Sequence, residues 1–167
     1  MTARSFAARL LLVGFIAACG GAQSPVPVVG RQTDISQLTG EWLGEYSSGE
    51  TGRSGSIVFT LTAGSDTATG DVVMTPQWVL RPPTGQATGQ VAPPPATQAI
   101  DIRFVRVTGG QVSGALAPYT DPSCNCPLHT TFVGRLVGDT LSGTYTSQHD
   151  QSHDTQKGRW RVVRKGQ

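Results

Sequence analysis

Charged side chains are scarce in this chain of 167 residues. Its 13 Lys and Arg and 11 Asp and Glu make up 14% of the residues, against about 25% in an average soluble domain. A coiled coil or a charged disordered tail needs more charge than this, and a nucleic-acid-binding protein needs a clustered positive field. We therefore expect no nucleic acid among the partners of this protein.

Motifs of the common enzyme classes are also missing. The chain has no Gly-x-Ser-x-Gly nucleophile elbow, no His-Glu-x-x-His motif, no phosphate-binding loop and no dinucleotide fingerprint. The adjacent pairs His149-Asp150 and His153-Asp154 are a weak basis for acid–base chemistry, because neighbouring side chains on an extended chain point apart. We expect a non-enzymatic protein with no catalytic residues and no cofactor.

Long helical patterns are lacking too. The chain contains 21 Gly and 11 Pro, and no segment beyond the N-terminal region repeats apolar residues every 3.6 positions. Gly weakens the interior of a helix and Pro breaks it. The composition therefore predicts an all-β protein of one domain, with essentially no helix outside the N-terminal region.

The N-terminal region has the pattern of a secretory signal. Its charges are Arg4 and Arg9, which precede the apolar run Leu10–Ile16. This run is shorter than the roughly 20 residues that span a bilayer as a helix, and it is typical of the apolar core of a signal peptide.

The residues Ile16-Ala17-Ala18-Cys19 resemble the lipobox of bacterial lipoproteins. In that family the cysteine thiol receives a diacylglycerol and the signal is cut just before it, which implies a signal peptide over residues 1–18 and lipid attachment at Cys19. A plain signal peptide cut at Ala-x-Ala is the alternative. Gly20 stands where lipoproteins kept in the inner membrane commonly have Asp, so the resemblance implies an outer-membrane lipoprotein that faces the periplasm or the cell surface.

Cleavage would remove two of the basic residues and leave 11 residues of each sign. The membrane is then the partner that the lipid anchor supplies, since several acyl chains hold a protein firmly at about 0.8 kcal/mol per buried CH₂. Residues 19–37 are rich in Gly, Ala, Ser, Pro and Val without periodicity, and we expect them to be a flexible tether. The folded domain is expected over 38–167.

Alternating apolar and polar residues predict eight strands in this domain. They are expected at about 41–46, 56–62, 67–75, 99–108, 111–117, 128–137, 140–147 and 157–165. In the fourth strand the apolar face changes near Phe104 and Val105, which predicts a β-bulge.

Glycines mark the turns between these strands. The segments 64–70, 109–114 and 138–143 each have Gly with Asp or Gly at a turn and another Gly a few residues into the next strand. The turn residues favour tight hairpins, and a Gly within a strand permits a bend or the close approach of a large side chain. Tight turns between successive strands predict an antiparallel, up-and-down order.

The charges of the first and last strands indicate that the sheet closes into a barrel. Glu41 and Glu45 lie on one face of the first strand, and Arg159 and Arg161 lie on the matching face of the last. Opposite charges favour pairing of two strands. Closure would also bring Trp160 beside Trp42 on the other face.

The segment Leu38-Thr39-Gly40-Glu41-Trp42 resembles the start of avidin-type and lipocalin-like barrels, the calycin group. Those families share Gly-x-Trp at the start of the barrel, and often have a basic residue on the last strand that packs over the Trp. Arg164 matches that basic residue. The resemblance implies a single eight-stranded antiparallel barrel, but we find no counterpart of the biotin-contacting residues of avidin, so biotin binding is not carried over.

An eight-stranded barrel is just wide enough to be filled by side chains or to hold one small ligand. If a cavity exists it would be apolar, with two tyrosine hydroxyls as polar groups. The function is therefore either binding of a small apolar ligand or a structural or adhesive role of a filled barrel. We favour a role for Trp42 as a structural plug over a role as a ligand contact. The candidate ligand-binding residues are Trp42, Tyr46, Phe59, Phe132, Tyr145 and Trp160.

A proline-rich insertion interrupts the strand pattern at 76–98. It holds six of the 11 prolines, and runs of Pro cannot lie in a central strand. Long loops in compact domains are usually functional or disordered. Trp78 and Leu80 could cover the mouth of the barrel or dock a partner, and a loose insertion is the alternative.

Two cysteines remain beyond Cys19, in the segment Cys124-Asn125-Cys126-Pro127-Leu128-His129. Outside the inner membrane the environment is oxidising, which favours a Cys124–Cys126 disulfide and no metal. The alternative is a zinc-binding protein or a metal-dependent enzyme in which Cys124, Cys126 and His129 are joined by His149 and His153, although the usual Cys-x₂-Cys spacing is absent.

Overall fold

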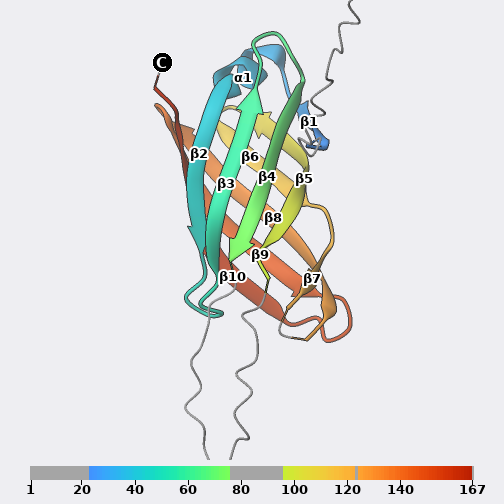
Figure 1. The fold of residues 1–167 in the computed structure, drawn as a ribbon. Helices are drawn as coiled ribbons and strands as arrows, with labels where there is room; N and C mark the ends of the chain where they lie inside the picture. Colours follow the sequence, from blue (N-terminus) through green and yellow to red (C-terminus); the bar gives the residue numbers. More distant parts are fainter. Residues whose placement is uncertain (1–22, 76–95, 123, 167) are drawn as a thin grey trace, which may run out of the picture.

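The computed structural model describes residues 23–75, 96–122 and 124–166. Ten strands and two short helices make up this part of the chain (Figure 1). In order they are β1 (Pro25–Val29), α1 (Gln32–Ile35), the 3₁₀-helix η1 (Ser36–Leu38), β2 (Gly40–Ser47), β3 (Ser54–Leu61), β4 (Thr67–Thr75), β5 (Gln98–Thr108), β6 (Gln111–Leu116), β7 (Tyr119–Asp121), β8 (Cys126–Val137), β9 (Thr140–His149) and β10 (Thr155–Arg164).

The strands form one sheet that closes on itself. Strands β2, β3, β4, β5, β6, β8, β9 and β10 pair antiparallel in succession, and β10 pairs with β2 to complete the ring. Strand β1 lies between β4 and β5, so the closed barrel has nine strands, and β7 pairs only with β8. The expectation of an all-β barrel is confirmed, and the expected count of eight strands is wrong by one.

The additional strand lies in the segment that we expected to be a tether. Strand β1 pairs antiparallel with Thr67–Thr69 of β4 through its first residues and parallel with Val105 and Arg106 of β5 through its last. It buries Val26 and Val28, and leaves the alternate residues Pro25, Pro27 and Val29 exposed. This alternation has the period of two that is typical of a strand. The sequence does not predict the strand, because the segment is only five residues long and its prolines have no N–H to donate.

The helices α1 and η1 were not expected either, because the sequence predicts a tether over most of this segment and essentially no helix. These seven residues form consecutive turns that cover one end of the barrel (Figure 1). They bury Ile35 and Leu38 in the apolar core. We call this the helix end of the barrel, and we call the opposite end, where β7 and the β2–β3 turn lie, the polar end.

The eight strands expected from the sequence are all present, and no boundary is shifted by more than two residues. The pairing of β5 with β6 changes register between Ile102 and Phe104, which confirms the predicted bulge. Strands β2 and β10 pair as expected, with Glu45 opposite Arg161 and Lys165 Nζ 3.0 Å from Glu41 Oε2. Trp160, however, lies opposite Tyr46, and it is Arg164 that lies opposite Trp42. Arg159, by contrast, lies opposite Ser47 rather than a glutamate.

The signal peptide, Cys19 and most of the proline-rich insertion, including Trp78 and Leu80, lie outside the described residues. Within the described part, no helix is long and apolar enough to cross a membrane.

Candidate functional site

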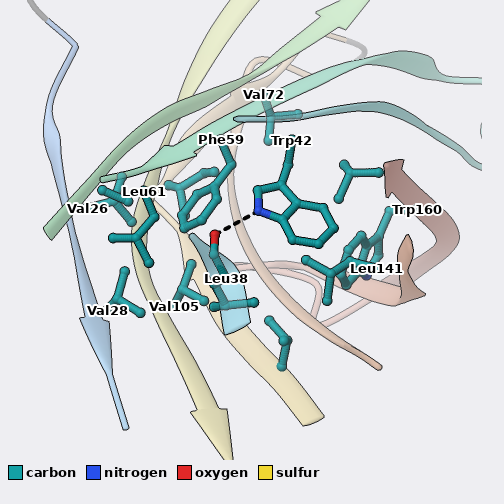
Figure 2. Packing of buried hydrophobic residues seen from close by; sticks show 14 of the residues in the cluster. Val26, Val28, Leu38, Trp42, Phe59, Leu61, Val72, Val105, Leu141 and Trp160 are labelled. Atoms are coloured by element: carbon teal, nitrogen blue, oxygen red, sulfur yellow. Dashed lines mark hydrogen bonds between the residues drawn. The ribbon is translucent and has the colours of Figure 1, made fainter. Parts of the chain in front are cut away.

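The indole of Trp42 seals the helix end of the barrel. Trp42 is fully buried, and its Nε1 donates a hydrogen bond of 2.8 Å to the carbonyl oxygen of Leu38 (Figure 2). The guanidinium carbon of Arg164 lies 4.3 Å from the centre of the indole ring. The expected contact between a basic residue of the last strand and this tryptophan is therefore present as a cation–π pair.

Arg164 also ties the last strand to the helices. Its guanidinium donates hydrogen bonds to the carbonyl oxygens of Gln37, at 2.8 Å, and of Thr39. Its Nε lies 2.9 Å from Asp139 Oδ1. These contacts fix the chain just before β2, which positions Gly40 and Trp42 at the barrel wall.

Inside the barrel is an apolar cavity of about 100 Å³. Its lining runs from Leu38 at the helix end to Thr51, Arg53 and Gln156 at the polar end. Five of the six candidate ligand-binding residues line this cavity: Tyr46, Phe59, Phe132, Tyr145 and Trp160. The sixth, Trp42, is not among the lining residues, which agrees with its interpretation as a plug.

Glycines on nearby strands make room for the large rings of the lining. A Cβ placed on Gly114 would lie 2.3 Å from the Phe132 ring, and one on Gly134 would lie 2.4 Å from the Trp160 ring. The ring of Tyr145 covers Gly158 in the same way. Because these rings occupy space at the wall that a side chain would otherwise fill, they leave part of the interior open.

Tyr46 and Tyr145 bring two phenolic hydroxyl groups to the cavity. Their rings meet edge to face, with centres 5.7 Å apart. Burial raises the pKa of both phenols above the ordinary value of 10, and the neighbouring phenol of Tyr145 raises the pKa of Tyr46 further. Both groups are therefore neutral at physiological pH and can donate or accept a hydrogen bond.

Three more hydroxyl groups form a network nearer the polar end. Thr130 Oγ1 and Ser147 Oγ are buried and lie 2.6 Å apart, and the Tyr119 hydroxyl lies 3.0 Å from Thr130 Oγ1. Each hydroxyl both donates and accepts, so the network satisfies groups that would otherwise be costly to bury. All three residues line the cavity.

The polar end is held by an ionic cluster around Asp121, which is completely buried. Its carboxylate pairs with the guanidinium of Arg53 and accepts hydrogen bonds from His149 Nε2, at 2.9 Å, and Gln156 Nε2, at 3.4 Å. Arg53 Nη1 also donates to Gln156 Oε1 at 3.2 Å. The cluster joins the β2–β3 turn, β7, β9 and β10.

Cys124 and Cys126 form the expected disulfide, with Cα atoms 5.2 Å apart. His129, which the zinc alternative placed with them, pairs with Asp150 at 2.8 Å, and both of these side chains are half exposed. His153 is exposed in the turn before β10. The histidine beside the cysteines is His149: one of its ring nitrogens and both sulfur atoms lie within 4.8 Å of one another.

The sequence alone does not identify three residues of this cluster, which are Arg53, Asp121 and Gln156. Each stands in or beside a turn, where a polar residue is ordinarily solvated, and they are separated by up to 103 positions in the chain. A weak signal was present, because Asp121 begins a segment that contains both cysteines. Only the fold brings these side chains together.

Comparison of the chain with protein-family models, with curated proteins and with solved structures finds no match.

Proposed function

We propose that this protein is a lipid-anchored lipoprotein of the bacterial outer membrane whose barrel binds a small, neutral, largely apolar ligand without transforming it. The observation that carries the proposal is the apolar cavity of about 100 Å³, lined by aromatic side chains and two neutral phenols. Pockets for small molecules commonly combine an apolar lining with a few polar groups that fix orientation.

The size of the cavity limits the ligand. A cavity of roughly 150 Å³ holds a benzene molecule, so one of about 100 Å³ admits nothing larger than a single ring or a short aliphatic chain. The phenols of Tyr46 and Tyr145 would bind one hydrogen-bonding group of that ligand. The charge of Arg53 is compensated by the buried carboxylate of Asp121, which favours a neutral ligand over an anion.

The resemblance to calycin barrels supports the proposal. Gly40-x-Trp42 opens the first strand of the antiparallel ring, and Arg164 of the last strand packs over Trp42. Barrels of that group carry small ligands in their interior. The lipobox-like segment before Cys19 supports attachment to the membrane, and Cys19→Ser should abolish both incorporation of labelled palmitate and membrane retention.

Binding can be tested with phenol and toluene as probes, by titration followed through chemical shifts of the cavity side chains. We expect saturable binding of both, with phenol the tighter because its hydroxyl can bond to Tyr46 or Tyr145. Val112→Phe should fill the cavity and abolish binding, since Val112 lines it. Val137→Phe is the matched control, because Val137 is 70% exposed on the outer face.

Absence of saturable binding by the wild-type protein, or equal loss in the two phenylalanine variants, would overturn the ligand-binding proposal. That result would favour the structural or adhesive role of a filled barrel.

A further inference from the structure

The turn between β7 and β8 places two sulfur atoms beside a histidine of β9. Asn125, between the two cysteines, has a positive φ of 55°, and its N–H donates a hydrogen bond of 2.8 Å to the carbonyl oxygen of Asp121. Asn tolerates this left-handed conformation better than most residues. The resulting turn brings Cys124, Cys126 and His149 together, with their potential ligand atoms within 4.8 Å of one another.

The ring of His149 is held in an orientation that leaves one nitrogen available. Its Nε2 lies 2.9 Å from the buried carboxylate of Asp121, which can only accept, so Nε2 carries the proton. Nδ1 is then an acceptor. It is buried and has no hydrogen-bond partner among the described residues, and a buried acceptor that nothing binds destabilises the fold.

A carboxylate that accepts the N–H of an imidazole is the usual support of a metal-binding histidine. It fixes the tautomer and the ring orientation, and it raises the basicity of the other nitrogen. In this structure Arg53 and Gln156 hold the Asp121 carboxylate in turn. The imidazole of His149 is therefore positioned as a ligand, with its free nitrogen as the donor atom.

We propose that, when the disulfide is reduced, Cys124 Sγ, Cys126 Sγ and His149 Nδ1 bind a Zn²⁺ or Cu⁺ ion. Thiolate and imidazole are the preferred ligands of these two cations. Zn–S bonds of about 2.3 Å at a tetrahedral angle put two thiolates about 3.8 Å apart, which two cysteines with Cα atoms 5.2 Å apart can reach. Three protein ligands leave a fourth zinc position for water.

The disulfide and the metal site exclude each other, because both use the same two sulfur atoms. A dithiol reductant would supply the two electrons that break the S–S bond and two protons for the sulfur atoms, and its own thiols would become a disulfide. Metal binding would then release the two cysteine protons. Cys124 is exposed, so a reductant can reach this bond. The site is independent of the proposed cavity ligand, and neither proposal requires the other.

The test uses the full chain in detergent, reduced with dithiothreitol and freed of it without oxygen. Co²⁺, as a spectroscopic probe for Zn²⁺, should bind once per reduced chain and give a sulfur-to-metal charge-transfer band. Zn²⁺ should displace it, and Cu⁺ should be taken from a chromogenic chelator. The oxidised chain should bind none of these ions at this site.

Variants separate this site from adventitious binding. In the reduced state Cys126→Ser and His149→Ala should weaken Zn²⁺ binding by at least about 100-fold, and Asp121→Asn by about 10–100-fold, as loss of a supporting group does. His129→Ala is the matched control, since His129 also contacts a carboxylate but lies outside the cluster, and it should bind as the wild type does.

The proposal is overturned if the reduced wild type binds no stoichiometric metal, or if His129→Ala weakens binding as much as His149→Ala. Should Asp121→Asn or His149→Ala fail to fold, Cys124→Ser at its exposed position decides the question. All comparisons are made with reduced protein, in which the wild type also lacks the disulfide.

Discussion

At the helix end of the barrel the buried Trp42 and the neighbouring Arg164 bond to backbone carbonyl groups, whereas at the polar end the buried Asp121 bonds to other side chains. Trp42 and Arg164 donate to the carbonyl oxygens of residues 37–39. Asp121 is instead surrounded by the side chains of Arg53, His149 and Gln156. The first arrangement is a fixed plug, and the second brings a carboxylate, a guanidinium and an imidazole together at one end of the barrel.

The largest difference between the ends should appear when a carboxylate is removed from each. Asp121→Ala would leave the buried charge of Arg53 without its main partner and should destabilise the protein by about 3–5 kcal/mol. Asp139→Ala, which removes the exposed partner of Arg164, should cost less than about 1 kcal/mol. Urea unfolding of both oxidised variants measures this, and equal losses would contradict the comparison.

Arg164→Lys examines the plug itself. The ammonium group of lysine lacks the planar geometry that lets a guanidinium bond to two carbonyl groups while it stacks on the indole. We therefore expect the free energy of unfolding to fall by about 1–3 kcal/mol. Arg161→Lys, on the exposed face of the same strand, should change it by less than about 0.5 kcal/mol. A quenched or shifted tryptophan fluorescence in the first variant alone would agree with a change around Trp42, the indole that Arg164 contacts.

Gly134→Ala examines the wall between the two ends. The added methyl group would meet the Trp160 ring at 2.4 Å, and overpacking of this kind costs about 1–3 kcal/mol. Gly49→Ala is the control, because nothing lies within 4 Å of its position. Thermal unfolding should separate the two variants, and an unchanged melting temperature in Gly134→Ala would mean that Trp160 moves freely.

The smallest expected effect concerns alkaline pH. The pKa of Tyr46 is raised in the folded state, so above about pH 10 the unfolded chain loses this proton first. The stability that neutral Tyr46 contributes is present below pH 10 and declines as the pH rises, by at most about 1.4 kcal/mol per pH unit. Urea midpoints between pH 9 and 11 should fall less steeply in Tyr46→Phe than in the wild type.

The sequence was most informative where local pattern decides the structure. Period-2 alternation predicts eight strands, and the change of face near Phe104 predicts the bulge. The contact of Arg164 with Trp42 follows from the resemblance to calycin barrels and not from local pattern. Strand β1 was missed because its two prolines interrupt the donor pattern of a strand. The Asp121 cluster was missed because its members stand in separate turns, and no local pattern reports a contact across 103 positions.

The position of β1 also sets how far the barrel can stand from a membrane. Cys19, the proposed site of the lipid, is six positions before Pro25, the first residue of β1. Six residues reach at most about 20 Å even when fully extended. An anchored barrel would therefore be held close to the bilayer surface, and any pull on its lipid would act directly on a strand of the barrel wall.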